Sequence, residues 1–177
     1  MSQTNELEIM ERIALDLEGV EESLASSFNT GAEDFNALIR PLSAAGGKRL
    51  RAQLCLLIAN AGTSIERQRV KIAEAVEMLH LATLIHDDVL DQAEIRRGED
   101  TIHMHKGNKV AILSGDYLFA KAFKIVSEMT NMKYLQVFSH IITCLVEGEF
   151  MQMEDVYRID QGIERYMTKT QKKTADF

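Results

Sequence analysis

The stretch EMLHLATLIHDDVLDQAEIRR, Glu77–Arg97, decides the fold predicted for this chain. It ends a longer run, Thr63–Arg97, that contains neither glycine nor proline. Apolar residues recur in this run at helical spacing, as at Ile72, Val76 and Leu79. This spacing predicts one long helix of roughly 50 Å, since each helical residue adds about 1.5 Å.

Charged residues crowd the last turns of the predicted helix, although its apolar spacing directs it toward a core. Residues at i, i+7 and i+11 of a helix share one face, which here joins His80, Asp87 and Asp91. Asp88 follows Asp87 directly, and two arginines end the stretch. Buried charges at this density are unfavourable unless they bind something, so the stretch is a candidate site.

The composition predicts one all-helical domain. The chain has 177 residues, of which 46% are hydrophobic and 27% charged, as in ordinary globular proteins. A single proline, Pro41, and the lack of a convincing alternating segment favour helices over strands. The formal charge of -7, without a basic stripe interleaved with aromatic residues, argues against a nucleic-acid binder. We therefore expect one all-α bundle over residues 1–177.

The same survey predicts the protein's location and the state of its thiols. The N-terminal residues MSQTNELEIM have no signal-peptide layout, and no apolar run approaches the roughly 20 residues of a membrane span. We expect a cytoplasmic protein with at most peripheral membrane contact. Cys55 and Cys144 both stand among apolar residues, which predicts buried free thiols rather than a disulfide or a metal site.

Helical spacing predicts further helices on both sides of the central stretch. They cover residues 6–28, a short piece around 35–40, and then 111–130, 134–157 and 163–177. The segment Gly98–Lys109 is expected to be a loop. Its His103 and His105 lack a partner at familiar zinc spacing, so metal binding there is disfavoured. No helix-stop signal precedes Phe177, and we expect the chain to be cut there.

Cations cluster where another predicted helix begins. Gly46 and Gly47 interrupt the chain just before an apolar run, whose first turns carry Lys48, Arg49 and Arg51. Cations oppose the helix dipole at this end, so helix stability does not explain them. Exposed amides beside several cations make a good phosphate site. A solvated basic turn is the alternative, and the stretch alone does not decide between the two.

The acids suggest a chemistry for these cations. Asp87 and Asp91 are one helical turn apart, and Mg²⁺ suits such a pair because it combines one or two carboxylates with substrate phosphates. Acid–base catalysis would also use paired carboxylates, but it leaves the cations without a role. A magnesium-bound diphosphate is an activated leaving group, and its departure from an organic chain gives a carbocation. Apolar helices would shield that carbocation from water.

Six short motifs follow one another along the chain. They are GGKRLR (46–51), LIHDDVLD (84–91), RRG (96–98), GD (115–116), GEFMQ (148–152) and KTA (173–175). In this order they resemble the trans-polyprenyl diphosphate synthases, the head-to-tail prenyltransferases. An isolated DDxxD motif is weak evidence, but six ordered motifs are strong. The resemblance implies an antiparallel helical bundle of the isoprenoid synthase type.

The resemblance also implies a reaction and roles for individual residues. The allylic diphosphate ionises, the isopentenyl double bond attacks, and a proton is lost. The implied ligands of Mg²⁺ are Asp87, Asp88 and Asp91. The implied contact of the allylic diphosphate is Arg96. The implied ligands of isopentenyl diphosphate are Lys48, Arg51, His80 and Arg97. The implied catalytic residues near the reacting carbons are Lys173, Thr174 and Gln152.

The product and the assembly are further implications. Ala82 and Thr83, just before the acid motif, are not aromatic. In the resembled family bulky side chains at these positions close the substrate tunnel, so we expect a medium- or long-chain polyprenyl product. The family also implies a homodimer or a heteromer with a small subunit.

The chain departs from the family in one important respect. The family carries a second aspartate-rich motif after KTA, and residues 1–177 end before it. We therefore expect the C-terminal helices of the bundle to be missing and this chain alone to have little or no turnover. A class I terpene cyclase is a second interpretation, but GGKRLR and KTA would serve a second diphosphate that a cyclase does not bind. A non-catalytic partner subunit or scaffold is the third.

Overall fold

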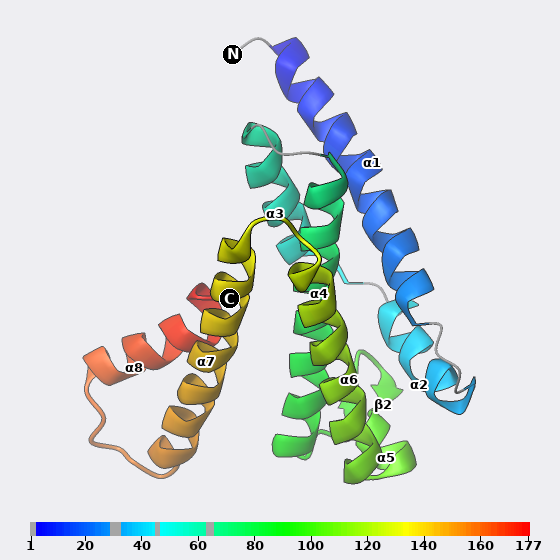
Figure 1. Cartoon of the computed structure of the whole chain (residues 1–177). Helices are drawn as coiled ribbons and strands as arrows, with labels where there is room; N and C mark the ends of the chain where they lie inside the picture. Colours follow the sequence, from blue (N-terminus) through cyan, green and yellow to red (C-terminus); the bar gives the residue numbers. More distant parts are fainter. Residues whose placement is uncertain (1–2, 29–32, 45–46, 63–65) are drawn as a thin grey trace. The chain divides into compact units, whose positions relative to one another are not determined.

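The computed structural model describes residues 3–28, 33–44, 47–62 and 66–177. Its helices are α1 (Gln3–Ser27), α2 (Glu33–Ala44), α3 (Leu50–Ala61), α4 (Glu66–Leu90), α5 (Ile102–Lys106), α6 (Asn108–Ser127), α7 (Met132–Asp155), α8 (Ile163–Thr170) and the π-helical turn η1 (Gln171–Ala175) (Figure 1). A short antiparallel hairpin joins β1 (Ile95–Arg96) to β2 (Glu99–Asp100). The all-α fold class predicted from the sequence is confirmed. The chain forms two compact units, Met1–Glu128 and Met129–Phe177.

Helix α4 is the central element of the first unit and packs against α1, α3 and α6. Figure 1 shows α4 and α6 side by side. The spacing correctly predicted a helix that turns apolar residues toward a core, although Ile72 and Val76, which showed that spacing, are only partly buried. Its buried residues include Ala73, Met78, Leu79, Ala82 and Ile85.

Helix α4 is shorter than predicted, and the expectation of one helix through Arg97 is wrong. The helix ends at Leu90, and Gln92 then adopts a left-handed backbone with φ 53°. The amide of Ala93 donates to the carbonyl of Asp88 at 2.9 Å, which is the 6→1 hydrogen bond of a Schellman-type helix end. Glycine or asparagine usually marks such an end, so a glutamine there gave no stop signal in the sequence.

The hairpin and α5 replace the loop predicted for residues 98–109. Arg97 and Gly98 form the hairpin turn with φ values of 55° and 86°. The hydroxyl of Thr101 donates to the carbonyl of Ala93 at 2.8 Å, which fastens the end of the hairpin to the end of α4. Strands of two residues are too short to leave an alternating apolar pattern, so the sequence did not indicate them.

The other predicted helices are present with shifted ends. Helix α2 continues through Pro41, beyond the short helix expected around 35–40. Helix α6 begins at Asn108 and ends at Ser127, earlier than expected at both ends. The side chain of Asn131 accepts from the amide of Lys133 at 3.0 Å and so caps the start of α7. Residues 46 and 63–65, which the sequence analysis also used, lie outside the described residues.

In the second unit, α7 packs against α8 and η1. Asp155, buried at the end of α7, accepts from Arg165 Nε at 2.5 Å and from Lys169 Nζ at 3.1 Å. The hydrogen bond from Arg165 is the largest of the effects that hold the pKa of Asp155 below its usual range. Gly148 lies against η1, because a Cβ there would come within 2.8 Å of Lys173 Cγ. Ion pairs and close packing therefore fix α8 and η1 on α7.

Both cysteines are free thiols, as predicted. Cys144 is buried, whereas Cys55 is only partly so, and burial raises the pKa of the Cys55 thiol to about 11. Among the described residues, no helix is both long enough and apolar enough to cross a bilayer.

Close packing between α4 and α6 centres on Gly115. A Cβ at this position would collide with the imidazole ring of His86. The His86 ring also lies 3.1 Å from the carbonyl of Ile112 and contacts the ring of Phe119. The glycine of the GD motif therefore makes room for the imidazole that directly precedes the acid motif.

We expect Gly115→Ala to lower the free energy of unfolding by about 1–3 kcal/mol, because the added methyl group overpacks the contact with His86. Chemical denaturation followed by circular dichroism measures the change. In a His86→Ala background the same substitution should be clearly less destabilising. An equal loss in both backgrounds would contradict the contact.

Candidate functional site

Two of the cations predicted to lie in the first turns of α3 lie in the turn that precedes this helix. Helix α3 begins at Leu50, so Lys48 precedes it and Arg49 is its N-cap residue. Arg49 has a left-handed backbone, with φ 47° and ψ 37°, which is uncommon for a residue with a side chain. Gln53 Nε2 donates to the carbonyl of Lys48 at 2.6 Å. The expectation that Lys48 and Arg49 lie in the first helical turns is therefore wrong.

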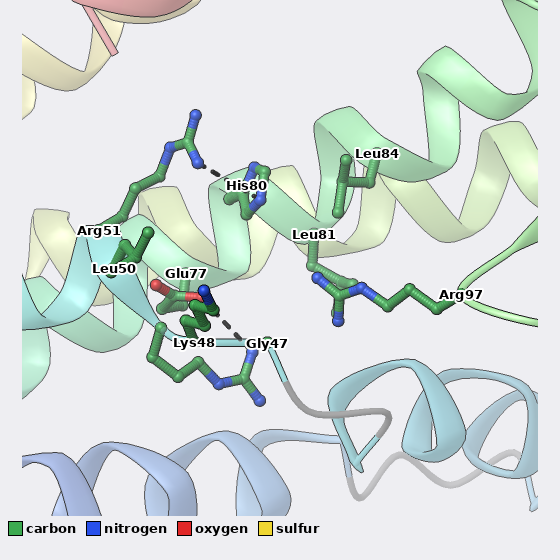
Figure 2. Close-up of a pocket in the computed structure, with 10 residues that line it drawn as sticks. Gly47, Lys48, Leu50, Arg51, Glu77, His80, Leu81, Leu84 and Arg97 are labelled. Atoms are coloured by element: carbon green, nitrogen blue, oxygen red, sulfur yellow. Dashed lines mark hydrogen bonds and ion pairs between the residues drawn. The ribbon is translucent and has the colours of Figure 1, made fainter.

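A cavity of about 260 Å³ joins this turn to α4 and to the hairpin. Figure 2 shows Lys48, Arg51, His80 and Arg97 around it. Gly47 belongs to the same wall, because a Cβ there would lie 3.0 Å from Arg97 Nη2. The structure thus brings together, from three separate segments, all four residues that were predicted to hold isopentenyl diphosphate.

His80 is the neutral member of this group. Its Nε2 lies 3.5 Å from Arg51 Nη1 and must accept there, because a guanidinium only donates. The imidazole proton then belongs on Nδ1. Burial, followed by the charges of Arg51, Arg97, Arg96 and Arg49, lowers the pKa of His80 to about 4. At neutral pH the pocket therefore combines cations with an uncharged hydrogen-bond donor.

Two carboxylates face Arg49, which also lines the cavity. Its Nε donates to Glu21 Oε1 at 2.6 Å, and its Nη1 lies 3.4 Å from Glu77 Oε2. The hydrogen bond to Glu21 is the largest of the effects that raise the pKa of Arg49. Arg49 was counted among the cations of the predicted phosphate site, and the structure pairs it with carboxylates of the protein itself.

The three acids of the motif have different surroundings at the end of α4. Asp88 is 6% exposed and accepts from Arg96 Nε at 2.7 Å. Burial raises the pKa of Asp88, while the hydrogen bond from Arg96 lowers it. Asp87 is half-buried and Asp91 is exposed. The amide of Asp91 donates to the carbonyl of Asp87 at 2.8 Å, so these two keep the spacing of one helical turn although α4 ends between them.

The surroundings of these three acids bear on whether they could hold a metal ion. Within the described part of the chain, no group of three or more His, Cys, Asp or Glu side chains is arranged to hold a metal ion. Two carboxylates one turn apart, such as Asp87 and Asp91, still fit Mg²⁺, which completes its shell with waters and substrate phosphates. The assignment of these two residues and Asp88 as magnesium ligands stays a prediction.

A second, larger cavity of about 620 Å³ lies between α2, α4 and the hairpin. Leu81, Leu84 and Arg97 line both cavities, so the two are neighbours. The walls of the second cavity also include Asp88 and Arg96. Ala82, the residue predicted to set the product length, is completely buried in the core, and its role stays a prediction.

The predicted catalytic residues belong to the second unit. Lys173 Nζ donates to Gln152 Oε1 at 2.8 Å and pairs with Glu149 Oε2 at 2.5 Å. Thr174 is exposed. The structure therefore brings Lys173 and Gln152 together and adds Glu149, an acid that was not among the predicted catalytic residues.

Comparison with known proteins identifies the family. Residues 32–177 match the family described as Polyprenyl synthetase. The chain belongs to this polyprenyl synthetase family. It is 38% identical over 161 residues to heptaprenyl diphosphate synthase component 2 of Geobacillus stearothermophilus, covering 90% of this chain and 50% of that protein. It is 34% identical over 167 residues to octaprenyl diphosphate synthase of Escherichia coli (strain K12), covering 94% of this chain and 52% of that protein.

A solved structure is similar as well. The polyprenyl synthase from Caulobacter crescentus CB15, complexed with calcium and isoprenyl diphosphate, has a TM-score of 0.88 and 34% sequence identity, covering 94% of this chain and 52% of that one. The chain thus spans about half the length of the relatives it matches. The resemblance stated from the six motifs is confirmed, and so is the isoprenoid-synthase type of helical fold.

We expect His80 to titrate near pH 4 in the folded protein, against 6.5 for an ordinary histidine. Between these values the unfolded chain binds a proton that the folded protein does not. This residue should therefore make the free energy of unfolding fall as the pH is lowered from 6.5 toward 4. An NMR titration of the histidine ring signals, assigned with His80→Gln, measures the midpoint. A midpoint at 6.5 or above would contradict the buried, cation-lined environment.

Proposed function

We propose that this chain carries the isopentenyl diphosphate pocket and the first acid motif of a polyprenyl diphosphate synthase. The reaction is the Mg²⁺-dependent condensation of isopentenyl diphosphate with an allylic diphosphate. The observation that carries the proposal is the cavity that gathers Lys48, Arg51, His80 and Arg97. Converging cations and a neutral donor suit a diphosphate, whose oxygens accept several charge-assisted hydrogen bonds. The names of the similar heptaprenyl and octaprenyl synthases support a medium- or long-chain product.

In this proposal the cavity holds the attacking substrate. Lys48, Arg51 and Arg97 bind the diphosphate of isopentenyl diphosphate. His80 accepts from Arg51 through Nε2, and we assign to its Nδ1–H the role of donor to a phosphate oxygen. Fixing the diphosphate orients the attached double bond, and such orientation lowers the barrier by converting an encounter into an intramolecular step.

The acid motif holds the second substrate. Asp87, Asp88 and Asp91 would coordinate Mg²⁺, which when bound neutralises the charge that develops on a departing diphosphate. Asp88 holds Arg96 by the hydrogen bond at 2.7 Å, and Arg96 then contacts the same diphosphate. The allylic C–O bond breaks, the isopentenyl double bond forms the new C–C bond, and the proton lost from the product passes to the released diphosphate. Lys173, Thr174 and Gln152 are proposed as catalytic residues of the second unit.

The assembly and location belong to the proposal as well. One similar protein is named component 2 of a heptaprenyl diphosphate synthase, which supports a heteromer with a small subunit. A homodimer is the alternative. We place the protein in the cytoplasm.

In a thermal-unfolding scan, Mg²⁺ with farnesyl diphosphate should stabilise this chain, by about 2.7 kcal/mol when the ligand is at about 100 times its dissociation constant. Asp87→Asn and Asp91→Asn should each abolish the magnesium-dependent part, because each removes a carboxylate from the pair. Asp88→Ala should abolish it too, since it removes a proposed magnesium ligand as well as the anchor of Arg96. Glu94→Gln, an exposed acid outside the motif that lines neither cavity, is the control. A cooperative transition without any shift would favour a non-catalytic scaffold.

Calorimetric titration with isopentenyl diphosphate tests the cavity. Each of Lys48→Gln, Arg51→Gln and Arg97→Gln should weaken binding about tenfold, because a hydrogen bond to a charged group contributes about 1.5–3 kcal/mol. Lys109→Gln removes the same charge from an exposed position at the start of α6 and should have little effect. If all four variants bind alike, net charge rather than this cavity determines the affinity.

A further inference from the structure

Among the described residues that line the cationic cavity, one is an acid, Glu77 of α4. Figure 2 shows its side chain in the same wall as Lys48 and Gly47. Glu77 is 5% exposed, so its charge is poorly screened by water. By Coulomb's law alone, a carboxylate at this place opposes the binding of a diphosphate. Its presence therefore needs a reason other than direct attraction of the ligand.

The first reason is the N-terminus of α3. Glu77 Oε1 accepts from the amide of Ala52 at 3.0 Å. Ala52 is the third residue of α3, and its amide is one of those that a helix leaves without an intrahelical partner. The N-cap residue, Arg49, makes no side-chain capping bond of its own. A carboxylate on α4 thus caps α3 across the interface between the two helices.

The second reason is the backbone of Arg49. A left-handed conformation is unfavourable for a residue with a side chain, so surrounding contacts must maintain it. Glu77 Oε2 lies 3.4 Å from Arg49 Nη1, and Glu21 of α1 binds the other side of the same guanidinium. The two carboxylates anchor the residue at which the chain changes direction between Lys48 and α3.

These contacts act on the residues that line the cavity. Lys48 and Arg51 stand on either side of Arg49, and Arg51 and Ala52 are neighbours in the first turn of α3. His80 follows Glu77 by three residues on α4, so the two occupy the same side of that helix. One acid therefore sets the turn that presents Lys48 and Arg51 against His80.

We propose that Glu77 is a positioning residue of the diphosphate cavity, which holds the turn Gly47–Arg51 in its binding geometry although its charge repels the ligand. The inference rests on the proposed function of the cavity. It assigns Arg49 to the same task, as an anchor rather than a ligand of the diphosphate.

The inference is tested by whether one substitution strengthens or weakens the binding of pyrophosphate. Glu77→Gln keeps the size of the side chain and an oxygen acceptor for the Ala52 amide, but removes the charge that holds Arg49. If Glu77 is only a neighbouring charge, this variant binds inorganic pyrophosphate more tightly than the wild type. If Glu77 positions the turn, the variant binds more weakly, by about threefold, and Glu77→Leu, which also loses the cap, by about tenfold.

Calorimetric titration with inorganic pyrophosphate and with isopentenyl diphosphate measures these affinities. Glu22→Gln on α1, exposed and outside the cavity, reports the effect of net charge alone and should leave both unchanged. The magnesium-dependent stabilisation by farnesyl diphosphate should also be the same in Glu77→Gln as in the wild type, which a general loss of structure would not allow.

Two outcomes would overturn the inference in distinguishable ways. Unchanged or tighter pyrophosphate binding by Glu77→Gln, while the wild type binds, overturns the positioning role and leaves the proposed function standing. A wild-type chain that binds neither pyrophosphate nor isopentenyl diphosphate overturns the proposed cavity, and the inference falls with it. Because Glu77→Gln preserves the side-chain shape, the decision does not depend on whether Glu77→Leu folds.

Discussion

The buried acids of α4 impose the constraint on which the first unit depends. A carboxylate removed from water needs a hydrogen-bonding or charged partner, and each of these acids takes its partner from a different element. Glu74 accepts from Ser23 and Ser27 of α1, both at 2.7 Å. Glu77 accepts from the start of α3, and Asp88 from Arg96 in the hairpin. Satisfying three acids therefore places α1, α3 and the hairpin around one helix.

The candidate site is a consequence of that arrangement. The hydrogen bond from Arg96 to Asp88 holds the hairpin against α4. Arg97, in the hairpin turn, then lines the cavity. The cap from Glu77 fixes the start of α3, which carries Arg51. Cations from segments far apart in the sequence then surround a neutral histidine whose pKa they help to lower. A diphosphate would compensate the mutual repulsion that this gathering creates.

The sequence predicted which segments are helical more reliably than it predicted where each helix ends. The apolar spacing of α4 predicted that the segment is a helix, but the helix ends before Gln92, where no glycine marks a stop. The hairpin was not predicted because two-residue strands leave no period in the sequence. Glu77 was not singled out either. A glutamate in a helical run resembles any solvated residue until the amide that it caps, 25 positions earlier, is known to lie beside it.

The sequence by itself determined the helical class, the family and the residue types of a magnesium and diphosphate chemistry, because periodicity and ordered motifs are local properties of a chain. Only the tertiary structure decided which charges neutralise one another and which converge. Arg49 and Arg51 are nearly adjacent and chemically alike, yet carboxylates from α1 and α4 face the first while the second lies beside His80. That division depends on the left-handed turn at Arg49 and on packing between helices, and neither has a signature in the order of the residues.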